Sequence, residues 1–209
     1  MKKKILITAG STWAKIDEVR VLTNIFTGRT GIELARALQK TGCRVTLLVN
    51  PHCVSKELSG LNAIEFFYYD EFKAKVVSLL KEKEFDAIIH TAAVSDYFLP
   101  KPIENKIPSG KKSLVFKLKP TQKIIKLMRV LNPGALLIQF KLEKSAKGLV
   151  DKAYSSLKAN DSDFVVANAL EDIDKKYLIS REKSIIKADG TAQLAQNLAK
   201  TINLLAFKK

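Results

Sequence analysis

Short apolar runs alternate with segments of helical apolar spacing along almost the whole chain. The first run covers residues 5–8, and a helical pattern follows it from Gly31 to Leu38. Alternation of this kind predicts βαβ units, in which parallel strands form a sheet with helices on both faces. We therefore expect one α/β domain over residues 1–209, with a doubly wound, mostly parallel sheet flanked by helices.

The same patterns give the approximate limits of the later elements. Strands are expected at residues 5–8, 44–49, 63–69, 87–91, 114–118, 135–140 and 164–167. Helices are expected at residues 31–38, around 72–79, at 122–131, around 146–157 and around 194–205. Residues 177–180 and 184–188 can pair as a small closing hairpin.

Two segments lack these patterns and are expected to be loops. Residues 13–26 form a long polar insertion after the first strand. Pro100, Pro102 and Pro108 interrupt the region after the fourth strand, where residues 109–112 resemble an exposed, mobile tip. We expect a flap in this second segment.

The charge of the chain limits its partners. There are 36 lysine and arginine residues against 21 acidic residues, a net charge of +15, which suits anionic ligands. The lysines are scattered and do not alternate with aromatic residues, so a basic nucleic-acid-binding module is a weaker alternative.

Apolar runs and cysteines indicate the compartment. No run reaches the roughly 20 apolar residues that a membrane helix requires, and the N-terminal run is too short for a signal peptide. Cys43 and Cys53 lack the spacing of a metal or redox motif, so unpaired thiols are expected. These features predict a cytoplasmic protein with no membrane partner.

Two glycine-containing loops are candidates for binding an anion. Gly10, Ser11 and Thr12 follow the first strand, where doubly wound sheets bind nucleotides, but the dinucleotide and P-loop fingerprints are missing. Residues 27–31, TGRTG, directly precede the first long helix and are the stronger candidate, because a helix N-terminus attracts phosphate. A side chain at Gly28 should block the approach of a ligand while leaving the fold intact.

Several motifs, in order, resemble those of the phosphopantothenoylcysteine synthetases. The matching stretches are residues 5–12, 16–20, 23–24, 28–31, 92–97, 104–107, 119–121, 139–143 and 163–168, which read ILITAGST, IDEVR, TN, GRTG, AAVSDY, ENKI, KPT, QFKLE and DFVVAN. The chain departs from the family pattern at Ser11, Phe26, Pro108 and Gln139. The resemblance spans nearly the whole chain and implies a Rossmann-like fold. The flavin-dependent decarboxylase domain that precedes this one in many bacteria is not expected here, which would make the chain a stand-alone synthetase.

The resemblance also implies a reaction and its participants. A phosphopantothenoylcysteine synthetase joins 4'-phosphopantothenate to L-cysteine through an acyl-nucleotide, here acyl-CMP, and releases pyrophosphate. CTP is expected as co-substrate, with ATP less suited, and Mg²⁺ would bridge the triphosphate without a dedicated cage of protein ligands. A homodimer is implied, in which the partner helps to complete the site.

The resemblance also implies the roles of individual residues, which are assigned from the matching positions of the family motifs. Lys106 in the flap would stabilise the triphosphate, and the Asn24 amide would donate to the acyl carbonyl, although either could instead be a solvated lysine or a turn residue. The implied nucleotide-binding residues are Gly10, Ser11, Thr12, Ala92, Asp96, Lys106 and Phe140. The implied phosphopantothenate-binding residues are Asn24, Thr27, Gly28, Arg29 and Gly31. Asp96 could bind the base or the sugar, or cap the next turn.

One competing interpretation uses a different motif. Tyr97 and Lys101 have the Y-x-x-x-K spacing of short-chain NAD(P)-dependent reductases. Pro100 and Pro102 oppose the continuous helix that this chemistry requires, so the reductase interpretation is disfavoured.

Overall fold

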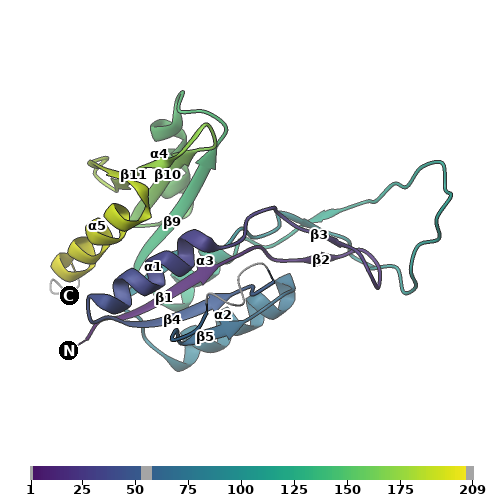
Figure 1. Ribbon diagram of the computed structural model, residues 1–209, viewed down its shortest axis with the longest axis horizontal. Coiled ribbons are helices and arrows are strands. Elements are labelled where there is room, and N and C mark those ends of the chain that lie inside the picture. The colour runs from purple at the N-terminus through teal and green to yellow at the C-terminus, as the bar shows by residue number, and fades with distance from the viewer. Residues whose placement is uncertain (1, 53–57, 206–209) are drawn as a thin grey trace.

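The computed structural model describes residues 2–52 and 58–205 (Figure 1). Cys43 carries a free thiol, as expected, whereas Cys53 lies outside the described residues. None of the helices in these two ranges is long and apolar enough to cross a membrane.

An eight-stranded sheet forms the centre of the molecule. Its order is β12 (Ile185–Asp189), β11 (Asp172–Ser180), β10 (Phe164–Ala169), β9 (Leu136–Glu143), β6 (Ala87–His90), β1 (Lys4–Ala9), β4 (Arg44–Val49) and β5 (Ala63–Glu65). Six of these strands are parallel: β5, β4, β1, β6, β9 and β10. The other two, β11 and β12, add an antiparallel hairpin at one edge. The predicted doubly wound α/β sheet with its closing hairpin is therefore confirmed.

Within the described residues, five helices cover the two faces of this sheet. They are α1 (Arg29–Lys40), α2 (Tyr69–Glu82), α3 (Ile124–Leu131), α4 (Leu149–Ala159) and α5 (Gly190–Leu205). In β1, Ile5 and Ile7 pack in the same cluster as α1 and α5, whereas Leu6 packs with α2 and α3. The alternation along a strand thus builds two cores, one on each face. A third cluster joins α4 to β10 and β11.

Two segments extend away from the sheet on the same side of the molecule (Figure 1). One is a hairpin of β2 (Ala14–Lys15) and β3 (Val21–Leu22), within the segment that was expected to be a loop. The other begins and ends at the paired strands β7 (Tyr97–Phe98) and β8 (Lys119–Pro120). We call residues 13–26 the hairpin and residues 99–118 the arm.

The strand expected at residues 114–118 is wrong. These residues belong to the arm and form no strand, although their sequence, LVFKL, has high β-propensity. Leu114, Val115 and Leu118 are exposed, and the side chain of Val115 is 85% accessible. Among the described residues no strand pairs with this segment, and of its apolar side chains only that of Phe116 is partly buried.

Two further predictions also require correction. The strand expected at residues 63–69 ends at Glu65, because Glu71 accepts the N–H groups of Phe67 and Tyr68, at 2.9 and 3.4 Å, and starts α2 at Tyr69. Tyr97 lies in strand β7 and not on a helix with Lys101, which removes the geometric basis of the reductase interpretation.

Candidate active site

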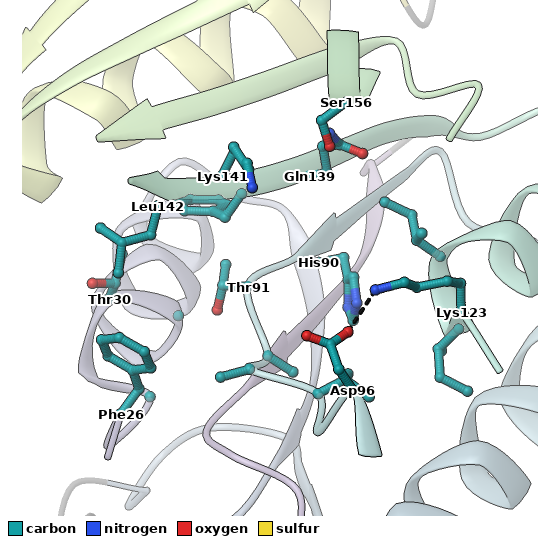
Figure 2. Close-up of a pocket in the computed structure, with 18 of the residues that line it drawn as sticks. Phe26, Thr30, His90, Thr91, Asp96, Lys123, Gln139, Lys141, Leu142 and Ser156 are labelled. Carbon is teal, nitrogen blue, oxygen red and sulfur yellow. Dashed lines mark hydrogen bonds and ion pairs between the residues drawn. The ribbon is translucent and has the colours of Figure 1, made fainter. Parts of the chain in front are cut away.

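A cavity of about 430 Å³ opens at the carboxyl ends of β1 and β6 (Figure 2). The chain places β4 and β5 on one side of β1, and then β6, β9 and β10 on the other side, so the topological switch point lies between β1 and β6. Doubly wound sheets bind their ligands at this point. Its walls come from the start of α1, the start of α3, the end of β6 and the segment that follows it, and from β9. The cavity therefore receives side chains from elements on both faces of the sheet.

Glycines bring the start of α1 against the end of β1. Gly28 precedes the helix with a left-handed φ of 88°, and a Cβ there would lie 2.4 Å from the backbone nitrogen of Gly10. A Cβ on Gly31 would lie 2.6 Å from the Cβ of Ala9. The expectation that a side chain at Gly28 leaves the fold intact is therefore wrong, because the backbone of Gly10 occupies the space.

The N-terminus of α1 faces the cavity without a neutralising group of its own. Its N-cap, Gly28, makes no side-chain cap bond, and its first turn has no acidic residue, while the N–H of Arg29 donates to Thr27 Oγ1 at 3.4 Å. Thr27 to Gly31 line the cavity. The positive end of the helix dipole therefore remains available to an anion. Among the charged side chains that line the cavity, Arg29, Lys123 and Lys141 outnumber Asp96, which strengthens that preference.

Asp96 and Lys123 form an ion pair at the edge of the cavity (Figure 2). The Nζ of Lys123 lies 2.5 Å from Oδ1 of Asp96, and both side chains are largely exposed. Exposed pairs of this kind contribute little to stability, about 0–1 kcal/mol, so a ligand can displace Lys123 easily. Asp96 can then accept a hydrogen bond from a hydroxyl or amino group.

His90 also lines the cavity and is neutral at physiological pH. Its Nδ1 is 2.7 Å from Oγ1 of Thr8, and its ring stacks against Phe72. Burial lowers the pKa of His90 to about 4. The side chain can therefore offer the cavity a hydrogen bond without a positive charge.

Gln139, which replaces the glycine of the family motif, joins β9 to α4. Its Nε2 donates to Ser156 Oγ at 3.0 Å, and its Oε1 accepts from Asn160 at 3.0 Å and from Ser162 at 2.9 Å. Every polar group of this buried amide therefore has a partner, and the larger side chain is accommodated at the cavity wall.

A second cavity of about 170 Å³ adjoins the first. Asn24 and Ser11 line it, and Phe26 and Thr27 line both cavities and so separate them. Asn24 donates its amide to the carbonyl of Ala93 at 3.3 Å, and the Ser11 hydroxyl donates to the carbonyl of Phe26 at 2.8 Å.

The expected site residues fall into three groups. Thr27, Gly28, Arg29, Gly31, Ala92, Asp96 and Phe140 line the larger cavity. Ser11, Asn24 and Thr27 line the smaller one. Gly10, Thr12 and Lys106 line neither cavity. Thr12 instead holds the segment that follows β6, because its hydroxyl accepts the N–H of Ser95 at 2.9 Å. Lys106 lies in the arm.

Three polar residues were not among the expected site residues: His90 and Lys123, which line the larger cavity, and Asp17, which lies in the hairpin. His90 is the last residue of β6 and Lys123 follows β8, so their positions near strand ends could have identified them. Asp17 accepts the N–H groups of Val19 and Arg20, a turn that aspartate favours, but its third backbone partner, Ile107, is 90 residues away. No local pattern reveals that contact.

Comparison with known proteins identifies the family. The DNA/pantothenate metabolism flavoprotein C-terminal domain matches residues 1–203. The coenzyme A biosynthesis bifunctional protein CoaBC of Thermococcus kodakarensis is 36% identical over 171 residues, 81% of this chain and 42% of that protein. CoaBC of Borreliella burgdorferi is 34% identical over 187 residues, 86% of this chain and 47% of that protein. The chain thus spans less than half the length of these two relatives.

A solved structure agrees with these matches. The DNA/pantothenate metabolism flavoprotein from Streptococcus pneumoniae is 29% identical, with a TM-score of 0.82 over 97% of this chain and 99% of that one. The resemblance inferred from the motifs is confirmed. The chain belongs to the DNA/pantothenate metabolism flavoprotein C-terminal domain family.

Proposed function

We propose that this protein is a phosphopantothenate–cysteine ligase of coenzyme A biosynthesis. It joins 4'-phosphopantothenate to L-cysteine through an acyl-CMP intermediate and releases pyrophosphate. The observation that carries the proposal is the cavity at the uncapped start of α1, lined by more cationic than anionic side chains, in a relative of CoaBC proteins. Both the phosphorylated acid and the nucleoside triphosphate are anions that such a site attracts.

The chemistry requires two different kinds of assistance. A carboxylate must first attack an α-phosphate that already carries negative charge, so cations are needed to hold the anions and to stabilise the departing pyrophosphate. Lys106 supplies a cation for this step. The amino group of cysteine then attacks the acyl carbonyl and displaces CMP. The neutral amide of Asn24 can donate to the developing oxyanion without forming an ion pair with the phosphate.

The remaining roles follow the two cavities. Thr27, Gly28, Arg29 and Gly31 bind phosphopantothenate at the start of α1, while Ala92, Asp96 and Phe140 border the nucleotide base and sugar. Gly10, Ser11 and Thr12 form the loop that supports the nucleotide. Mg²⁺ would accompany the triphosphate and offset its negative charge, with phosphate oxygens and water as its main ligands.

We also propose that the protein acts as a cytoplasmic homodimer. Exposed apolar side chains gather on the hairpin and the arm: Val19, Leu22, Ile25, Phe26, Ile103, Leu114, Val115 and Leu118. Apolar groups on two projecting segments are typical of a surface that another chain covers. Lys106 lies outside the cavities of its own chain, and a second copy offers a site that it can help to complete.

Pyrophosphate release tests the reaction directly. The purified protein should release pyrophosphate with 4'-phosphopantothenate, cysteine, CTP and Mg²⁺, and more slowly with ATP. Release that does not depend on phosphopantothenate would refute the ligase proposal. Equal rates with CTP and ATP would refute only the nucleotide preference. Salt-dependent binding of a DNA duplex, with no pyrophosphate release, would favour the nucleic-acid-binding alternative instead.

A further inference from the structure

Asp17 is a buried carboxylate to which the reaction described above gives no role. It lies in the hairpin and is only 1% exposed. Its Oδ1 accepts the N–H groups of Val19 at 2.9 Å and Arg20 at 2.8 Å, and its Oδ2 accepts the guanidinium of Arg20. A buried carboxylate needs such partners, because an unpaired one would be strongly destabilising.

The remaining hydrogen bond of Asp17 crosses to the arm. The N–H of Ile107 donates to Oδ2 of Asp17 at 3.0 Å, and Arg20 reaches the carbonyl of Ile107 at 3.4 Å. Ile107 is 2% exposed, whereas the other described residues between 100 and 118 are exposed, apart from the half-buried Phe116. Ile107 is therefore the point at which the arm is fixed to the hairpin.

A second bond fixes the arm just before this point. The N–H of Ile103 donates to the carbonyl of Ile16 at 2.8 Å. Lys106 lies between the two attachments and immediately precedes Ile107. Its backbone is therefore held against the hairpin, and only its flexible side chain is free to search for a ligand.

The carboxylate of Asp17 is ionised at physiological pH. Burial alone would raise the pKa of the Asp17 carboxyl, but the hydrogen bonds from Ile107, Val19 and Arg20 outweigh it and lower the pKa to about 2. The acceptor therefore stays ionised, and hydrogen bonds to an ionised acceptor are stronger than those between neutral groups.

We propose that Asp17 is a positioning residue for Lys106, because its buried carboxylate holds the N–H of Ile107 and so fixes the backbone that carries the lysine. The inference rests on the proposed function, in which Lys106 assists formation of the acyl-nucleotide. It differs from a flap that moves freely along its whole length, because hydrogen bonds at Ile103 and Ile107 hold residues 103–107 against the hairpin.

The test compares Asp17→Asn with Asp86→Asn. Asp86 is a matched control, because its carboxylate also accepts a backbone N–H, that of Lys4 at 2.7 Å, but at the opposite end of the sheet. Amide hydrogen exchange should increase at residues 103–107 in Asp17→Asn and remain unchanged there in Asp86→Asn. The kcat of acyl-nucleotide formation should fall by about tenfold or more in Asp17→Asn only, the scale of weakening one charge-assisted hydrogen bond. The KM for phosphopantothenate should change by less than about twofold, because the change affects a transition-state contact.

A double-variant cycle separates positioning from general damage. If Asp17 acts through Lys106, adding Asp17→Asn to Lys106→Gln should lower kcat little further. Losses that multiply would overturn the proposal, as would unchanged exchange at residues 103–107. If Asp17→Asn does not fold, Ile107→Pro removes the same hydrogen bond from the arm and must give the same loss and the same non-additivity.

Failure of the proposed function has a different result. If the unaltered protein makes no acyl-nucleotide from any nucleoside triphosphate, the ligase proposal fails and the catalytic positioning role fails with it. The exchange measurement still decides whether Asp17 fixes the arm.

Discussion

Replacing Gly28 with alanine should destabilise the protein more than the same change at Gly42. Both glycines have a φ of 88°, one just before α1 and the other just after it. A Cβ at Gly42 meets no atom within 4 Å, whereas a Cβ at Gly28 would lie 2.4 Å from the nitrogen and 2.8 Å from the Cα of Gly10. Comparing the two variants therefore separates the cost of the left-handed backbone, which both share, from the steric clash with Gly10, which only the Gly28 variant has.

The expected magnitudes follow from these two terms. A residue with a side chain costs about 1–2 kcal/mol in the left-handed conformation, which applies to both variants. Overpacking costs about a further 1–3 kcal/mol, and only at Gly28, where the opposing atoms are backbone and cannot rotate away. We expect a loss of about 1–2 kcal/mol for Gly42→Ala and about 2–5 kcal/mol for Gly28→Ala.

Thermal and urea unfolding, followed by circular dichroism without ligand, measure both losses. For a chain of this length, 1 kcal/mol corresponds to about 2–4 °C in Tm, so the two variants should be clearly resolved. Equal destabilisation of the two variants would refute the close approach of Gly28 to Gly10. The ligand affinity of a Gly28 variant is informative only where the variant is shown to be folded.

Three further results are expected. Lys106→Gln should slow acyl-nucleotide formation by about 10²-fold, whereas Asn24→Ala should let the acyl-nucleotide accumulate to detection by mass spectrometry, and failure of both at one step would contradict the two roles. The free energy of unfolding should fall by on the order of 3 kcal/mol between pH 6.5 and pH 4, because the unfolded chain protonates His90 in this window and the folded chain resists it. His90→Gln should flatten this slope in urea unfolding at several pH values, and an unchanged slope would assign it to other groups. Val115→Asp should reduce the mass measured by light scattering from two chains to one, and a dimer that persists would place the interface elsewhere.

The buried strands could be predicted because the apolar residues on both sides of each strand indicate that both faces of the sheet are covered. Arg44 to Val49 is apolar on both sides, as expected for a strand covered by helices on both faces, and its limits were predicted correctly. The run at residues 114–118 is equally apolar but exposed. The sequence of a segment indicates that its apolar side chains favour burial. It does not indicate whether other elements of the fold pack against that segment.

The site shows the same division. The cavity beside Gly28 and Gly31 could be predicted, because a glycine-rich loop before a helix favours an anion through the backbone alone. The link between Asp17 and Ile107, and the network around Gln139, depend on partners far away in the sequence. Their chemistry is visible in the residue types, but their pairing arises only when the sheet brings distant segments together.

The cavity spans the boundary between two cores that the sheet otherwise keeps apart. Its wall at α1 belongs to the cluster shared with α5, and its wall at α3 belongs to the cluster shared with α2. A ligand that fills the cavity would contact helices on both faces of the sheet. Its binding free energy would therefore stabilise the packing of both helical layers against the strands. We therefore expect ligand binding to reduce the motion of both helical layers together, and the stability of each layer to affect the affinity of the site.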